Sequence, residues 1–159
     1  LSRDELVKLF EAMRIAKGFT IENHLPVRLL LILATRKSEL IGARVEEFDL
    51  DHGVWHLPAE RTKTNVAIDL PLPVPAVDAL RELMRLSGGS EYLLPARKRQ
   101  ERMLPHIHEN TLNVAMAKVR PHMKGVAPFT IHDFRLGRGA WPPWNGFRRG
   151  MVRSAAPLL

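Results

Sequence analysis

The sequence predicts a mainly α-helical domain with one small antiparallel β-sheet, an α+β fold. Several segments carry apolar residues at the spacing of an amphipathic helix. Two short apolar segments in the middle of the chain flank a polar turn, as the strands of a hairpin do. The composition of the 159-residue chain, 45% apolar and 26% charged, is that of a globular domain that buries a core without disulfides.

Two helices are expected in the N-terminal part of the chain. Ser2 and Glu5 have the spacing of a capping box and precede apolar residues in a helical pattern. A second helix is expected over about residues 24–35, with Pro26 in its first turn. Because this segment is apolar on nearly all sides, we expect it at the centre of the fold. The helical pattern continues over residues 36–44 as a separate or bent helix.

The middle of the chain predicts strands, and the rest predicts short helices. Residues 49–53 have turn chemistry, and residues 54–57 and 67–72 have the composition of strands. The remaining predicted elements are a helix opened by Pro75 and ended before Gly88, a short strand over 92–94, a helix over about 111–120 capped by Asn110, and a helix begun by the T-x-x-D box at 130–133.

Positive charge is concentrated in the C-terminal part of the chain. Residues 1–96 hold 12 Lys/Arg and 14 Asp/Glu, whereas residues 97–159 hold 12 Lys/Arg and 3 Asp/Glu. This asymmetry indicates a polyanionic partner, most simply nucleic acid, with a solvated basic face as the alternative. The candidate DNA-backbone contacts in the basic segment are Arg97, Lys98, Arg99 and Arg102.

Several classes of protein are excluded or disfavoured by what the sequence lacks. With no cysteine, the chain has no disulfide framework, cysteine nucleophile or zinc ribbon. No apolar run reaches the roughly 20 residues of a membrane span, and we expect a cytoplasmic protein with no membrane partner. His106 and His108 form H-x-H, but no third ligand accompanies them, so no metal site is expected. Glu46 and Glu47 are expected in a turn without an acid–base role.

Four residues become candidates for a site when they are considered together. Arg36 follows the central apolar helix, and Lys63 lies between the two predicted strands. His132 and Arg135 have the i, i+3 spacing of one helix face, in first turns where backbone N–H groups favour an anion. Each residue alone also has a structural explanation, such as a helix cap, a solubilising hairpin lysine or a buried hydrogen-bond network.

In their order along the chain these motifs resemble the catalytic domain of the tyrosine recombinases, the phage integrase family. The segment ATRKSELIGARVEEFDLDHGVWHLPAERTKT (34–64) resembles the family's Arg-x-x-Glu box, acidic turn and lysine-bearing hairpin. IHDFR (131–135) resembles its HxLR box, with Phe134 in place of leucine. The resemblance covers residues 1–135 and implies the fold of that catalytic domain, in an integrase of a prophage or another mobile element.

The resemblance also implies the activity, which is DNA integration and recombination through a 3′-phosphotyrosine, with no metal or other cofactor. Arg36 and Arg135 would bind the scissile phosphate, because an arginine fork matches phosphoryl oxygens. His132 would hydrogen-bond the same phosphate, and Lys63 would protonate the 5′-oxygen leaving group. Glu39 would help to orient the site. Double-stranded DNA would be the partner, with self-association of the full-length protein on DNA. We expect the four cationic residues to converge on one basic pocket.

The chain departs from the family pattern after Arg135. Residues 136–159 form a basic tail rich in glycine, proline and tryptophan, without any acidic residue, and a frameshift or truncation is the hypothesis for it. We therefore divide the chain into an incomplete catalytic domain, 1–135, and this tail. The single tyrosine, Tyr92, precedes the histidine box and is expected to pack in the core, so the chain is expected to lack its nucleophile. The alternatives are a non-catalytic DNA-binding remnant of the fold and a type IB topoisomerase-like enzyme.

Overall fold

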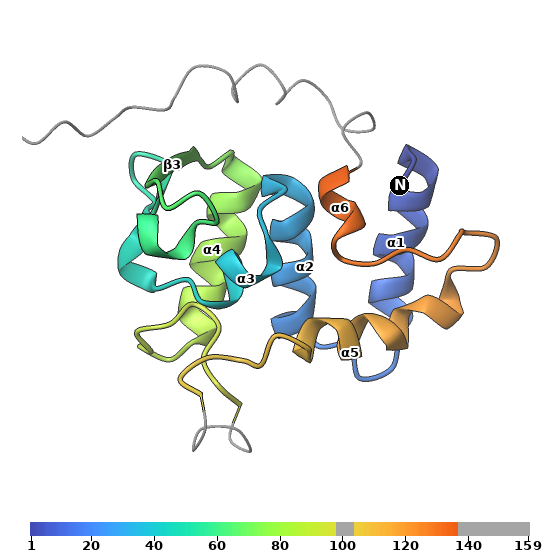
Figure 1. Ribbon diagram of the computed structural model, residues 1–159. Helices are drawn as coiled ribbons and strands as arrows, with labels where there is room; N and C mark the ends of the chain where they lie inside the picture. The colour runs from blue at the N-terminus through green and yellow to red at the C-terminus, as the bar shows by residue number, and fades with distance from the viewer. Residues whose placement is uncertain (98–103, 137–159) are drawn as a thin grey trace, which may run out of the picture.

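Helix α2 (Ile21–Leu33) runs through the middle of the molecule, with the other elements arranged around it (Figure 1). The computed structural model describes residues 1–97 and 104–136. Helix α4 (Val74–Leu86) packs on one side of α2, and the short helix α6 (Asp133–Leu136) packs on the other. The prediction of a central apolar helix is confirmed, because α2 packs against both α4 and α6 and most of its apolar residues are buried.

The remaining elements complete a helical domain with one small sheet. In chain order they are α1 (Arg3–Ile15), α3 (Lys37–Ile41), η1 (Val45–Glu47), β1 (Phe48–Asp49), β2 (Val54–Leu57), η2 (Ala59–Arg61), β3 (Ile68–Pro71), α5 (Thr111–Val119) and η3 (Arg120–His122). This arrangement confirms the predicted fold class. In the part of the chain that the structure describes, no helix is both long enough and apolar enough to cross a membrane.

The sheet is antiparallel in the order β1-β2-β3, with β2 in the middle. Along β2, Trp55 and Leu57 are buried, whereas His56 is exposed and contacts Asp69 of β3 at 2.7 Å. The two predicted strands are confirmed as β2 and β3, whereas β1 was not predicted from the sequence. This strand is too short to show a period of two, and it is held by the stacking of the Phe48 ring on Trp55, with centroids 5.0 Å apart.

Three predicted elements have different bounds in the structure. Helix α2 begins at Ile21, so Pro26 lies in its second turn rather than its first. The helix predicted over 36–44 is only the short α3, because the chain then leaves the helix to pair Arg44 with Tyr92. That isolated bridge is also all that remains of the strand predicted over 92–94.

The first and fifth helices follow their predicted signals to different degrees. Ser2 and Glu5 form both hydrogen bonds of the capping box at the start of α1. Asn110 stands at the N-cap position of α5, as predicted, but its side chain does not cap the helix. Instead, the Asn110 side-chain oxygen accepts a hydrogen bond from the side-chain Nδ2 of Asn113.

Leu40 packs α3 against the core, so a substitution of this residue measures what the packing of α3 contributes to the free energy of unfolding. Leu40 of α3 is completely buried, whereas Val74 at the start of α4 is 73% exposed. We expect Leu40→Ala to lower the free energy of unfolding by about 2–5 kcal/mol, because it leaves a cavity in the core. The matched control Val74→Ala should change it by less than about 0.5 kcal/mol. Urea denaturation followed by circular dichroism measures both, and equal effects would contradict the packing of α3.

Candidate active site

A cavity of about 360 Å³ opens where the start of α3, the start of α5 and the turn before α6 meet. Segments far apart in the sequence therefore line the same cavity. The lining residues are Thr35, Arg36, Lys37, Ser38, Glu109, Asn113, Thr130, Ile131 and His132. Arg36 and His132, two of the four predicted site residues, share this cavity, and Lys37 adds a further positive charge. Glu109 and Asn113 carried no signal in the sequence, because only the folding of α5 against the other segments brings them to the cavity.

The backbone between α2 and α3 places Arg36 at the N-terminus of α3. Helix α2 ends at Ala34, which adopts the left-handed conformation with φ of 49°, and the chain turns there into α3. Arg36 is the N-cap residue of α3. A left-handed residue other than glycine carries a conformational cost, so the surrounding packing must hold this turn.

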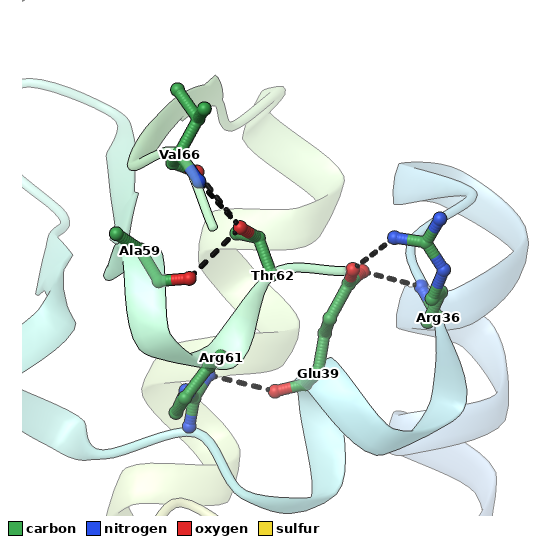
Figure 2. Close-up of polar contacts among 6 residues, drawn as sticks. All are labelled: Arg36, Glu39, Ala59, Arg61, Thr62 and Val66. Carbon is green, nitrogen blue, oxygen red and sulfur yellow. Dashed lines mark hydrogen bonds and ion pairs between the residues drawn. The ribbon is translucent and has the colours of Figure 1, made fainter. Parts of the chain in front are cut away.

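The carboxylate of Glu39 binds Arg36 at two points (Figure 2). The Arg36 backbone N–H donates to Glu39 Oε2 at 2.7 Å, and Arg36 Nη1 donates to Glu39 Oε1 at 2.7 Å. The Glu39 side chain is only 7% exposed, whereas 35% of the Arg36 side chain stays exposed. Glu39 thus fixes both the backbone and the guanidinium of Arg36, while about a third of the side chain stays exposed beside the cavity.

The loop that carries Lys63 is closed by the hydroxyl of Thr62, which is buried (Figure 2). This oxygen accepts the Val66 N–H at 3.0 Å and lies 2.9 Å from the carbonyl oxygens of Ala59 and Val66, either of which accepts its proton. Lys63 itself is exposed and is not among the residues that line the cavity. Lys63 therefore does not share the cavity with Arg36 and His132. Only its loop is joined to α3, through the hydrogen bond of Arg61.

Arg61 and Glu47 were missed by the sequence analysis. Arg61 Nη2 donates to the backbone carbonyl of Glu39 at 2.9 Å and lies 3.0 Å from Glu47 Oε2. Glu47, which we expected in a turn without an acid–base role, is buried and accepts a hydrogen bond from Trp55 Nε1 at 2.9 Å. All of these contacts are tertiary, so the local pattern around Glu47 could not reveal them.

His132 lies in the turn before α6 and is exposed. The helix begins at Asp133, so the prediction that His132 and Arg135 share a helix face is wrong. The turn is held by Asp133, whose carboxylate accepts hydrogen bonds from the N–H and the hydroxyl of Thr130 at 2.6 and 2.9 Å. These bonds, first from the backbone and then from the hydroxyl, hold the pKa of Asp133 below its usual range. The backbone of Arg135 lies in α6, and its side chain is outside the described part of the structure.

The predicted DNA-contact residues fall mainly outside the described residues. Lys98, Arg99 and Arg102 lie in the segment 98–103, which the structure does not describe. Arg97 is exposed, and its Nη2 donates to the side-chain oxygen of buried Asn23 at 2.5 Å. Arg97 therefore satisfies a buried amide of α2, in addition to any part that it takes in binding DNA.

Tyr92 is half-buried and lies apart from the cavity. Its ring packs against the ring of His106, with centroids 5.4 Å apart, and the guanidinium of Arg44 lies over it at 5.7 Å. The expectation that Tyr92 packs in the core is met only in part, because its side chain is half-buried. Within residues 1–97 and 104–136, no group of three His, Cys, Asp or Glu residues is placed to hold a metal ion, and His106 with His108 is no exception.

The fold is that of the tyrosine recombinase catalytic domain. It is similar to that of a lambda integrase dimer bound to a core site, with a TM-score of 0.63 at 20% identity over 85% of this chain and 47% of that one. The XerA recombinase gives a TM-score of 0.63 at 17% identity, over 85% of this chain and 47% of that one. These likenesses define the class of fold.

The chain belongs to the phage integrase family, whose profile matches residues 1–141. It is 30% identical over 115 residues to the prophage integrase IntA of Escherichia coli K12, covering 72% of this chain and 27% of IntA. It is 31% identical over 133 residues to the integrase of Enterobacteria phage P4, covering 76% of this chain and 29% of that protein. The chain thus spans less than a third of the length of either relative.

The burial of Glu39 predicts a stability difference between two ion pairs of the same spacing. Arg36–Glu39 and Glu82–Arg85 are both i, i+3 pairs, 2.7 and 2.6 Å long, but Glu82 is 38% exposed. We expect Glu39→Gln to lower the free energy of unfolding by about 1–3 kcal/mol, because it leaves Arg36 with an imperfect buried partner. The control Glu82→Gln should have no measurable effect, since exposed pairs contribute little. Equal losses in urea denaturation would contradict the special role of Glu39.

The lowered pKa of Asp133 predicts how the turn at His132 responds to acid. Because the folded pKa lies below the unfolded one, the ionised carboxylate favours the folded turn above about pH 4. This contribution is lost as the pH falls through the folded pKa. The Thr130 backbone amide, followed by NMR from pH 6 downwards, should titrate with a midpoint below about 3.9, the ordinary value for aspartate. Asp133→Asn should abolish the titration, and a midpoint at or above the ordinary value would contradict the hydrogen bonds described.

Proposed function

We propose that this chain forms part of the active site of a DNA integrase, in which a DNA phosphate binds between Arg36 and His132. The observation that carries the proposal is that these two residues, distant in sequence, line one cavity. Both curated relatives are integrases, and the similar solved structures include lambda integrase bound to a core site and a lambda integrase tetramer bound to a Holliday junction. These likenesses support the proposal that double-stranded DNA is the partner and that the full-length protein self-associates on it.

The proposed chemistry uses charge and position, without a metal ion. A tyrosine oxygen attacks the scissile phosphorus, the bond to the 5′-oxygen breaks, and the 5′-oxygen takes a proton from Lys63. Arg36, held by Glu39, and Arg135 of α6 stabilise the negative charge that gathers on the other phosphoryl oxygens. His132 hydrogen-bonds the same phosphate and assists proton transfer. Attack by the 5′-hydroxyl of another strand reverses the step and rejoins the DNA.

The proposal includes that this chain does not carry the nucleophile. Tyr92 is the single tyrosine of the sequence. Its ring packs against His106 and lies under the guanidinium of Arg44, and Tyr92 is not among the residues that line the cavity. The chain alone therefore binds DNA but does not cleave it, and cleavage needs a tyrosine from another segment or another protomer.

DNA binding tests the role of Arg36. Fluorescence anisotropy with a short duplex should show binding that weakens steeply with salt, because Lys and Arg side chains release counterions from the phosphates. Arg36→Gln should weaken binding roughly tenfold, since it removes a charged hydrogen-bond donor, and should reduce the salt slope by about 1. The control Arg85→Gln removes the same charge from an exposed pair on α4 and should have little effect. Equal effects of the two variants would overturn the placement of the phosphate at Arg36.

Covalent capture tests the absence of the nucleophile. With a nicked duplex substrate, the chain alone should give no protein–DNA band that survives a denaturing gel, because no positioned tyrosine oxygen is available. Addition of a family integrase that carries its own tyrosine but lacks its active-site arginines should restore the band. A stable band from the chain alone that disappears in Tyr92→Phe would overturn this part of the proposal.

A further inference from the structure

Glu39 connects two parts of the proposed site through different atoms. Its carboxylate holds Arg36, and its backbone carbonyl accepts the hydrogen bond from Arg61 (Figure 2). Arg61 ends η2 and stands two residues before Lys63. A two-residue segment spans at most about 7 Å, so the anchoring of Arg61 confines the backbone of Lys63 to a small region beside α3.

Arg61 makes this link from a largely buried position. Its side chain is 20% exposed, and that of its ion-pair partner Glu47 is 7% exposed. Nη2 makes both contacts, while Nε and Nη1 are buried without a hydrogen-bond partner among the described residues. The position of Arg61 thus depends on two contacts of one nitrogen, and Glu47 is in turn fixed by Trp55 at the centre of the sheet.

The part of the loop after Arg61 has its own closure, and among the described residues it makes no hydrogen bond or ion pair with α3. The Thr62 hydroxyl joins Ala59 to Val66 across the loop and so holds its shape. Those bonds are internal to residues 59–66, so they do not set where the loop lies relative to Arg36. The contact of Arg61 with Glu39 does so, because it joins the loop to the residue that also holds Arg36.

We propose that Arg61, held by Glu47, is a positioning residue that sets the Lys63 loop relative to Arg36. The proposal rests on the function proposed above, since it assigns Arg61 to the placement of the residue that would protonate the leaving group. Arg61 does not line the cavity and acts through Lys63. An arginine that served stability alone would alter the unfolding temperature without changing where the folded loop lies.

The placement of the loop is measured without DNA. The chain has no cysteine, so cysteines introduced at exposed Lys8 on α1 and Thr64 in the loop accept nitroxide labels specifically. Double electron–electron resonance should give a narrow distance distribution in the parent chain. Replacing Arg61 with methionine alone leaves the Glu47 carboxylate buried without its partner, which threatens folding. The test variant is therefore Arg61→Met with Glu47→Gln, whose amide oxygen still accepts the Trp55 N–H.

In this double variant the distance distribution should become roughly twice as broad, because the loop loses the hydrogen bond that joins it to α3. The control Arg85→Met, which breaks an exposed pair on α4, should leave the distribution unchanged. Near-ultraviolet circular dichroism establishes that each variant is folded. An unchanged distribution in the folded double variant would overturn the proposal, even if its unfolding temperature fell.

The consequence for DNA is measured separately, by adding Lys63→Ala to the parent chain and to the double variant. We expect Lys63→Ala to weaken duplex binding roughly fivefold in the parent chain, and less than about twofold where Arg61 no longer places the loop. Equal losses in both backgrounds would contradict the positioning role. A broadened distribution with no loss from Lys63→Ala in the parent chain would support the anchoring of the loop and overturn the assignment of Lys63 to DNA.

Discussion

The arrangement of the site depends on the hydrogen bonds of Glu39. One residue holds the Arg36 guanidinium and backbone through its carboxylate, and the Lys63 loop through its carbonyl. The short helix α3 supplies this geometry because the carboxylate reaches back to the N-cap residue while the carbonyl faces Arg61. Arg36 and the loop that carries Lys63 are thus both hydrogen-bonded to Glu39, although one lies at a helix start and the other between two strands.

Burial gives this support its strength. A buried carboxylate with two charged or backbone donors is held far more tightly than an exposed surface pair, because losing either donor leaves an unsatisfied charge. Glu47 repeats the arrangement, since it accepts from Trp55 and pairs with Arg61. The two buried acids therefore form a connected series with Arg36 and Arg61 that fixes the cations at the edge of a basic, partly exposed site.

The sequence predicted the elements whose signals are local. The capping box at Ser2, the central apolar helix, the alternation in β2 and the ordered family motifs were each visible without the structure. Features made by tertiary contact were not visible. Strand β1 depends on stacking against Trp55, and Glu47 gains its role from a strand and a loop that follow it in the chain. The start of α6 was predicted too early because Asp133, which closes the turn, is also the first helical residue, and this left His132 in the turn.

The central claim is that Arg36 and His132 bind the same DNA phosphate, and a double-mutant cycle on duplex affinity tests it most directly. Arg36→Gln, His132→Gln and the double variant are compared with the parent chain by anisotropy at one salt concentration. If the two side chains share a phosphate, their effects should be non-additive by about 0.5–3 kcal/mol. Effects that add within about 0.3 kcal/mol would show that the two residues act on separate groups, and would contradict the claim.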